Sequence, residues 1–349
     1  MATDAFKITV LPDFFVDRII QISDIDSLTK IMVNKIEVGG GSIRGLNSID
    51  IKGGNAVNVA YCLAQLGISV HLFTVADSIG QSILNSTFQK YYPKVKLHIK
   101  NGKHGLTTIF EFTNSSFSVS NVMLSDVGDN RTFGPESFES SEIFSILKSS
   151  SAVVLTNWAS NLKGTDLLKY VFSNSPNALH FLDPADISER QLEFVNELKN
   201  NSNLINLLSV NENEYLHIIN IVLKMEGTNI LNNGKCVNQI TPFILCKSAS
   251  FLSNFFKINI CIHTMIGSVL SDGFNTVFVE SISPSKINIV SGAGDAWDSA
   301  FIFGYLLKLT FEERLCFANL YASLYLENTF NDAPSLQNIL NYLNDCYVK

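Results

Sequence analysis

The segment with the clearest chemical potential is the glycine-rich stretch VSGAGDAW at residues 290–297, which lies between an extended segment and a strongly apolar helical one. Gly292 and Gly294 let backbone amides converge, and the following helix adds its positive N-terminal end, so the turn can seat a phosphate. Asp295 falls in the first turn of that helix. Its carboxylate could accept a proton from an attacking hydroxyl while the amides of Gly292, Ala293 and Gly294 stabilise a transferring phosphoryl group. An ordinary glycine turn followed by a helix-terminal acid explains the same residues, so both interpretations stay open.

Two further segments could hold a small polar substrate. Gly53 and Gly54 again lead into a helix, where bare backbone could approach a ligand and Asn58 could hydrogen-bond a hydroxyl one turn later. Asp13 and Asp17 lie four residues apart just beyond the first predicted strand, where carboxylates could bind sugar hydroxyls. A turn between a ribbon and a helix, and a capped helix start, are the structural alternatives.

Short apolar or β-branched runs alternate along the chain with stretches of helical period. This pattern predicts an α/β fold, a three-layer, doubly wound, mostly parallel sheet with helices on both faces. We expect central strands at 8–11, 70–75, 152–156, 180–182, 204–209, 258–263 and 277–279. We expect helices at 56–66, 189–198, 213–223, 296–309, 311–326 and 335–346, with Gly67 ending the first and Thr310 and Ser335 capping the last two.

Two stretches break this alternation, residues 32–52 and 96–124, and their spacing is typical of antiparallel ribbons. Ribbons inserted early in an α/β domain predict a small β lid over the carboxyl edge of the sheet, where such folds place ligands. No internal repeat or low-complexity linker divides the chain. We therefore expect one domain over residues 1–349, with a lid built from roughly 14–52 and 96–124.

Composition narrows the functional classes. The 349 residues are 46% hydrophobic, which excludes a disordered chain, and a formal net charge of −7 argues against a nucleic-acid partner. The six cysteines show no ligand spacing and indicate a reducing compartment, while the six histidines are scattered and are expected to be structural. An acid near the N-terminus and short apolar runs argue against a signal peptide or a membrane span, so we expect a cytoplasmic protein.

Taken together, these motifs resemble the ribokinase-like (PfkB) carbohydrate kinase family over about residues 6–330. The motif ending in Asp295 is similar to the C-terminal signature of the family, whose aspartate is the catalytic base and whose preceding amides form an anion hole. Gly53, Gly54 and Asn58 are similar to the N-terminal signature. Further matches follow in family order at Asp77-x-x-Gly80, Asn130-Arg131-Thr132, Asp183-Pro184 and Asn211-x-x-Glu214.

The resemblance implies an ATP-dependent phosphotransferase that uses Mg²⁺ and acts on a small-molecule hydroxyl. Asp17 and Asp13 would contact substrate hydroxyls, as would Arg131. Asn211 and Glu214 would organise phosphates and magnesium, Glu214 through water. Nucleotide contacts are implied near Thr264, Gly267 and Asn319, and a homodimer formed through the lid is compatible with the arrangement.

Three departures from the family pattern shape the expected activity. Thr264 replaces the first glycine of a nucleotide-binding turn. Ile289-Val290 replaces an Asp-Thr pair, which removes the carboxylate of a monovalent-cation site, so we expect no potassium activation. Asn55-Ala56 replaces a Lys-Gly pair typical of phosphosugar kinases, which disfavours an already phosphorylated substrate. Two alternatives remain. One is a nucleoside kinase, in which aromatic residues of the lid would stack on a base: Phe14, Phe15, Phe110, Phe112 and Phe117. The other is a catalytically silent sensor that binds a sugar or a nucleotide.

Overall fold

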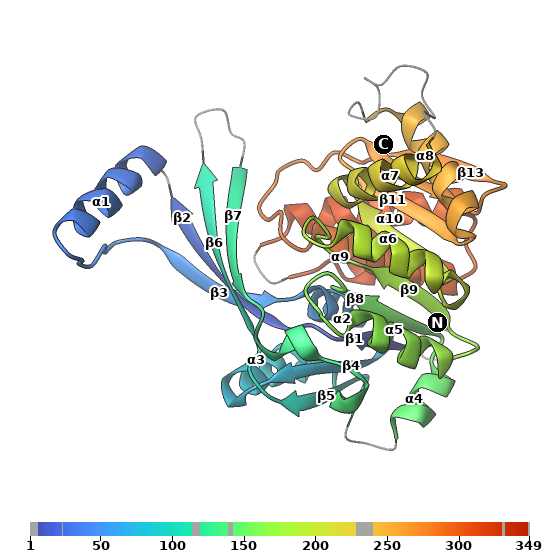
Figure 1. The fold of residues 1–349 in the computed structure, drawn as a ribbon, viewed down its shortest axis with the longest axis horizontal. Coiled ribbons are helices and arrows are strands. Elements are labelled where there is room, and N and C mark those ends of the chain that lie inside the picture. Colours follow the sequence, from blue (N-terminus) through green and yellow to red (C-terminus); the bar gives the residue numbers. More distant parts are fainter. Residues whose placement is uncertain are drawn as a thin grey trace.

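The computed structural model describes residues 6–22, 24–113, 119–138, 142–227, 240–329 and 332–347. Within these ranges the main sheet has nine strands (Figure 1). Their spatial order is β13 (Thr276–Glu280), β12 (Gly267–Ser271), β11 (Asn259–Thr264), β10 (Leu207–Asn211), β9 (Leu179–Asp183), β8 (Ala152–Thr156), β1 (Lys7–Leu11), β4 (Ser69–Ala76) and β5 (Val95–Asn101). Every neighbouring pair is parallel except at the β12 and β13 edge.

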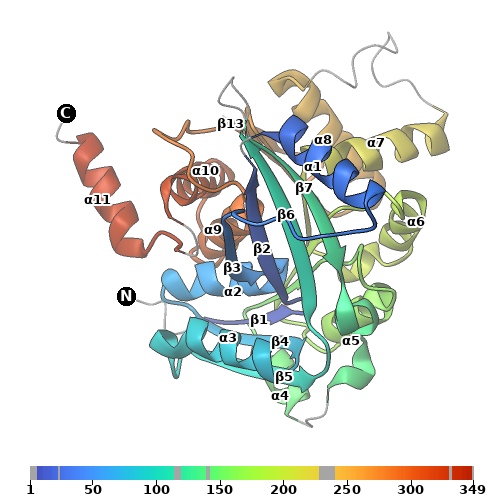
Figure 2. The same cartoon turned by 90° about the vertical axis from the view of Figure 1, so that its left-hand side faces the viewer.

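Helices cover both faces of this sheet, as the sequence predicts. One apolar core joins it to α2 (Asn55–Gln65), α3 (Ser78–Phe88), α9 (Ala293–Leu306) and α10 (Phe311–Glu327). The other core joins it to α4 (Ile143–Ser149), α5 (Gly164–Ser173), α6 (Gln191–Asn200), α7 (Glu212–Glu226) and α8 (Pro242–Phe256). The last helix, α11 (Leu336–Tyr347), lies at the outside beyond α10 (Figure 2). The predicted three-layer α/β class is confirmed.

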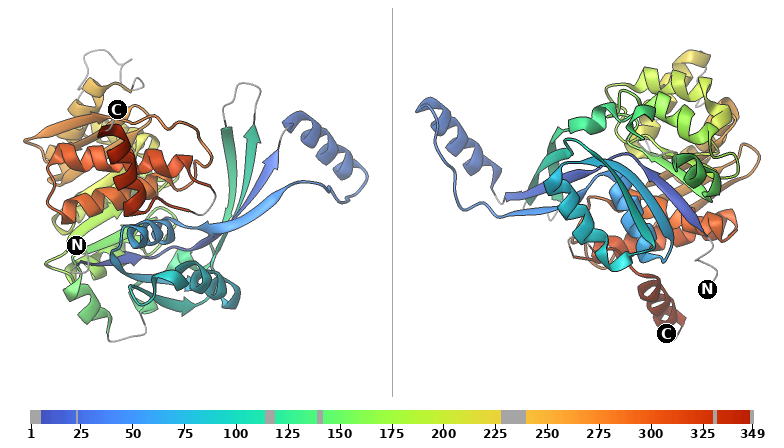
Figure 3. Two further views of the ribbon diagram at one scale, coloured as in Figure 1. Left: turned by 180° about the vertical axis from the view of Figure 1, so that it is seen from behind. Right: turned by 90° about the horizontal axis from the view of Figure 1, so that it is seen from below.

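A second sheet of four strands stands over the carboxyl edge of the first. Its order is β3 (Ser48–Gly53), β2 (Phe15–Ile22), β6 (Gly105–Thr113) and β7 (Val119–Asp126), with β2 and β6 parallel and the outer pairs antiparallel. Helix α1 (Ile25–Glu37) joins β2 to β3 at the end that points away from the body (Figure 3). We call this sheet the lid.

The bounds predicted for the ribbons need two corrections. Residues 32–37 belong to α1, which begins after Asp24, whose carboxylate accepts a hydrogen bond from the backbone N–H of Ser27 at 3.0 Å. Residues 95–101 form β5, which pairs along its whole length with β4 and so belongs to the main sheet. A strand at the edge of the main sheet and a strand of the lid both alternate apolar and polar residues, so the sequence pattern does not distinguish them.

Most predicted elements are confirmed, and their ends follow ordinary capping chemistry. Thr310 accepts a hydrogen bond from the backbone N–H of Glu313 at the start of α10, and Gly67 takes a left-handed φ of +83° just after α2. Strand β10 begins at Leu207, later than expected, because Ser202–Leu204 forms a 3₁₀ turn. No described helix is long and apolar enough to cross a membrane.

Candidate functional site

A cleft of about 800 Å³ lies between the lid and the carboxyl edge of the main sheet. Phe15, Asp17 and Thr107 line it from the lid. The loops after β8 and β9, the junction of β10 with α7 and the end of β11 supply the opposite side, and the start of α9 forms its floor. This is the edge at which open α/β sheets bind ligands.

Asp295 lies in the floor of the cleft with only 6% of its surface exposed. The side chains of Asn55 and Asn58, in the first turn of α2, donate to its two carboxylate oxygens at 3.0 and 2.9 Å. The two glycine motifs therefore meet at this carboxylate, although they are more than 230 residues apart in the chain. Burial raises the pKa of Asp295 well above its usual range, the charge of Asp183 adds to the increase, and the hydrogen bond from Asn58 opposes it.

The turn before α9 presents free backbone N–H groups. Gly292 caps the helix with a φ of +84°, and a Cβ there would lie 2.5 Å from the hydroxyl of Tyr325, so the position requires glycine. The N–H of Ala293 donates to the carbonyl of Val290 at 3.3 Å. The N–H groups of Gly292, Gly294 and Asp295 have no acceptor in the described part of the chain. Such a helix start favours an anion.

Further carboxylates converge on the same floor. Burial raises the pKa of Asp183 to about 6; the hydrogen bond from the N–H of Ala185 opposes this increase and the charge of Asp13 adds to it. Burial also raises the pKa of Asp298 well above its usual value, and the charge of Asp183 adds to that increase. Ser209 donates to one oxygen of Asp298 at 2.5 Å, and the other oxygen has no partner among the described residues. The floor therefore gathers buried acids whose environment opposes their ionisation.

Glu214, in the first turn of α7, fits a magnesium site in which water lies between the carboxylate and the metal. Both of its carboxylate oxygens already accept hydrogen bonds from Asn211, one from the backbone N–H at 2.9 Å and one from the side-chain amide at 2.6 Å. Mg²⁺ usually keeps several waters and takes few protein ligands. Within the described ranges there is no cluster of three or more His, Cys, Asp or Glu side chains that could hold a metal ion.

Asp17, on β2 of the lid, reaches the cleft from above. Burial raises its pKa to about 6, against the hydrogen bond from Thr107. Gly53, on the paired strand β3, leaves room for it, since a Cβ there would lie 2.1 Å from a carboxylate oxygen of Asp17. Arg131, in the 3₁₀ turn Gly128–Thr132 after β7, lines the mouth of the cleft with an exposed side chain.

Asp13 has a different environment from Asp17. Its carboxylate accepts four hydrogen bonds, from the N–H groups of Asn55 and Ala56 at 2.8 and 3.1 Å, the Thr156 hydroxyl at 2.7 Å and the Asn157 amide at 3.2 Å. These bonds fasten the start of α2 to the end of β8. Gly54 allows this contact with a φ of +91°, since a Cβ there would lie 2.9 Å from the carbonyl oxygen of Asp13. Contact between Asp13 and a substrate stays a prediction, and Gly54 lines the cleft itself.

The three remaining nucleotide-site residues do not line this cleft. Asn319 is surrounded by protein, since it accepts from Ser268 and Trp297, both at 2.8 Å, and donates to the carbonyls of Val279 and Glu280. The hydroxyl of Thr264 donates to the carbonyl of Gly267 at 2.8 Å and closes the hairpin between β11 and β12. Nucleotide contacts by Thr264, Gly267 and Asn319 stay predictions.

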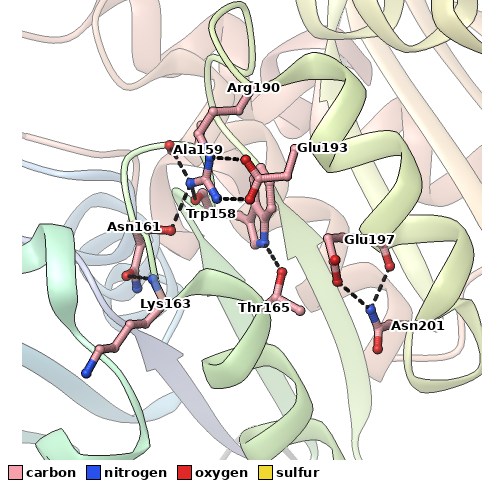
Figure 4. A network of polar contacts seen from close by, with 9 residues as sticks. All are labelled: Trp158, Ala159, Asn161, Lys163, Thr165, Arg190, Glu193, Glu197 and Asn201. Atoms are coloured by element: carbon pink, nitrogen blue, oxygen red, sulfur yellow. Dashed lines mark hydrogen bonds and ion pairs between the residues drawn. The ribbon is translucent and has the colours of Figure 1, made fainter.

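Sequence reasoning missed one wall of the cleft, which a single arginine organises (Figure 4). Arg190 donates to the carbonyls of Trp158, Ala159 and Asn161 at 3.0–3.3 Å, stacks over the Trp158 ring at 4.1 Å, and pairs with Glu193. These bonds hold the loop after β8, which lines the cleft. A lone arginine in a helical stretch carries no local signal, so the topology alone reveals its role.

His263 also lines the cleft beside the turn before α9, and it was expected to be structural. Its ring stacks on Trp297 with centroids 5.0 Å apart, and burial lowers its pKa to about 4. It is therefore a neutral group at neutral pH. The sequence offered one signal that His263 could line the cleft: it lies near the end of β11, where it pairs with Asn211 of β10.

Comparison with solved structures shows that the chain has the ribokinase-like fold. It is similar to an adenosine kinase from Sinorhizobium meliloti, with a TM-score of 0.71 and 16% identity over 98% of this chain and 99% of that one. A probable sugar kinase from Rhizobium etli gives a TM-score of 0.72 and 14% identity over 97% and 98%. A ribokinase from Arabidopsis thaliana, complexed with ribose and ATP, gives 0.70 and 16% over 97% and 99%.

At 14–16% identity, these similarities show a shared fold. No family model matches the sequence, and no curated protein matches it. The expectation of a ribokinase-like fold, made from the motifs, is confirmed by structures that cover nearly the whole chain.

Proposed function

We propose that the protein is an ATP-dependent kinase that phosphorylates a hydroxyl group of a small sugar, polyol or related molecule. The observation that carries this proposal is Asp295, which is buried in the floor of the cleft between two asparagine amides and follows a turn with free N–H groups. A carboxylate whose pKa is raised is suited to accept a proton near neutral pH. The solved structures of similar fold, an adenosine kinase, a probable sugar kinase and a ribokinase, support the same class.

In the proposed reaction, Asp295 accepts the proton of the acceptor hydroxyl. The hydroxyl oxygen forms a bond to the γ-phosphorus of ATP, the bond from that phosphorus to the β,γ-bridging oxygen breaks, and ADP leaves. The turn from Gly292 to Gly294 stabilises negative charge on the transferring group through its N–H groups. Asp17 binds acceptor hydroxyls from the lid, and closure of the lid excludes water as a competing acceptor.

Mg²⁺, when bound, neutralises negative charge on the phosphates. Asn211 and Glu214 are the residues that would hold it, through water, because both oxygens of Glu214 are already hydrogen-bonded to Asn211. The buried acids of the floor, whose pKa values burial raises, would be stabilised in their ionised forms by a divalent cation at this site.

The lid favours a sugar or polyol over a nucleoside. Of the aromatic residues proposed to stack a base, Phe15 lines the cleft, whereas Phe14 is fully buried in the apolar core. Phe110 and Phe112 alternate with Thr107 and therefore lie on the opposite face of β6, and Phe117 lies outside the described residues. The chain also has Asn55 and Ala56 where a lysine would favour a phosphorylated acceptor.

The test is an ADP-release assay with ATP, Mg²⁺ and a panel of sugars, polyols and nucleosides. We expect acceptor-dependent ADP release with a sugar or polyol. Release with nucleosides alone would reassign the acceptor. Calorimetric binding of a panel member without ADP release under any condition would contradict the kinase and favour a sensor.

A further inference from the structure

Lys52 is a buried cation beside the proposed base. It is the last residue before the Gly53-Gly54 turn, and only 8% of its surface is exposed. Its ammonium nitrogen lies 3.5 Å from Oδ1 of Asn58 and 4.3 Å from the centre of the Tyr61 ring. Among the described residues no carboxylate comes within 4.0 Å of it, so it is not neutralised by a direct ion pair.

Lys52 and Asp295 contact opposite ends of one amide. The ammonium of Lys52 donates to Oδ1 of Asn58, and Nδ2 of Asn58 donates to the carboxylate of Asp295 at 2.9 Å. An ammonium only donates and a carboxylate only accepts, so both contacts require the same amide orientation. If Asn58 flipped, its oxygen would face Asp295 and its NH₂ would face Lys52. Lys52 thus fixes the donor that holds the base.

A small cavity of about 10 Å³, about the size of one water molecule, lies beside these groups. Lys52, Asn58 and Asp17 line it together with Ser291 and Tyr325. Asp17 and Asn58 also line the main cleft. The ammonium therefore lies between the lid acid, the amide that holds the base and the loop before the anion-binding turn.

The charges around Asp295 are strongly unbalanced. Within the described residues, the titratable groups that act on Asp295, on Lys52 or on their neighbours include Asp13, Asp17, Asp183, Asp298, Asp332, Glu214, Cys62, Tyr61, Tyr325, His263 and Lys52. Asp186, Glu189, Arg131 and Arg190 line the same cleft. Lys52 is the cation that contacts the amide of Asn58. Burial lowers the pKa of Lys52, while the negative charges of Asp295 and Asp17 raise it. The face of the Tyr61 ring adds a further site that favours a cation.

We propose that Lys52 is a positioning residue of the transfer reaction, which holds Asn58 toward Asp295 and places a positive charge one amide away from this base. The proposal rests on the proposed function. A positive charge near a carboxylate lowers its pKa, so its removal must raise the pKa of Asp295. The deprotonated fraction of the base at neutral pH then falls, whereas the proposed nucleotide residues Asn211 and Glu214 do not contact Lys52 and stay in place.

The test compares the pH dependence of kcat/KM in the wild type, Lys52→Met and Lys52→Arg. Lys96→Met serves as the matched control, because Lys96 is an exposed strand lysine on β5 at the far edge of the sheet. For Lys52→Met we expect the acid limb to move up by about one pH unit, with an approximately tenfold loss at pH 7 that is largely recovered at pH 9. KM for ATP should change less than threefold. Lys52→Arg and Lys96→Met should keep the wild-type limb.

A second variant guards against misfolding of the first. Lys52→Ala opens a space next to the small cavity, and ethylammonium at tens of millimolar should restore part of its activity, whereas the same concentration of tetramethylammonium should not. An unshifted acid limb in a folded Lys52→Met, or no rescue of a folded Lys52→Ala, would overturn the proposal. If the wild type releases no ADP with any acceptor, the proposed function fails instead. The two failures are therefore distinguishable.

Discussion

The proposed acceptor end and the proposed nucleotide end of the cleft differ in where their predicted residues lie. At the acceptor end, Asp17, Asn58 and Arg131 all line the cleft, and Asp295 lies beneath them. At the nucleotide end, Asn211 and Glu214 line it, but the side chain of Asn319 is bonded to protein on both sides. Motifs at the ends of central strands are brought together by the sheet itself. Residues on hairpins and later helices depend on packing that a motif does not encode.

The largest effect is expected at the junction of the two ends. Asp295→Asn should lower kcat by ~10²–10⁴, because the hydroxyl then lacks a general base, while binding of ATP and acceptor persists. The measurement is steady-state ADP release, with calorimetry for binding and circular dichroism for folding. Asp166→Asn, an exposed acid in the first turn of α5, is the control. Wild-type turnover in a folded Asp295→Asn would remove this residue from the mechanism.

Asn319→Ala tests whether the nucleotide end was predicted in the wrong place. The substitution leaves Trp297 and Ser268 without their acceptor and two carbonyls without their donor. We expect the free energy of unfolding to fall by about 2–3 kcal/mol, since buried unpaired groups are costly. KM for ATP should change less than threefold. A tenfold rise in KM for ATP with unchanged stability would show that Asn319 contacts nucleotide after all.

Asp17→Ala sharpens the assignment of the acceptor end. Hydrogen bonds to a charged acceptor are worth roughly 1.5–3 kcal/mol each, so KM for the acceptor should rise tenfold or more, while KM for ATP stays near the wild-type value. Asp26→Ala, at an exposed acid on the helix α1 that joins two strands of the lid, should change neither constant. A rise confined to KM for ATP would reverse the two ends.

The fold and the centre of the site could be predicted from sequence because each rests on a local signal that the topology then combines. The glycine turns before α2 and α9 were visible as motifs, and parallel strands bring their residues to one edge. The partnership of Asn55 and Asn58 with Asp295 was not visible, since it joins helix starts at opposite ends of the chain. Lys52 was missed because a lysine in a strand ordinarily indicates an exposed face.

The smallest expected effect concerns monovalent cations, where the chain departs from the pattern that its motifs resemble. Ile289 is buried, the amide of Asn288 donates to the carbonyl of Glu327, and the carbonyl of Ser291 accepts from the Tyr325 hydroxyl at 3.0 Å. The loop therefore offers K⁺ no carboxylate, and neutral groups compensate a bare cation weakly. With Mg²⁺ present, activity should differ by less than twofold between potassium and tetramethylammonium chloride at equal ionic strength. Strong stimulation by potassium in that comparison would show that backbone carbonyls alone suffice beside Ile289.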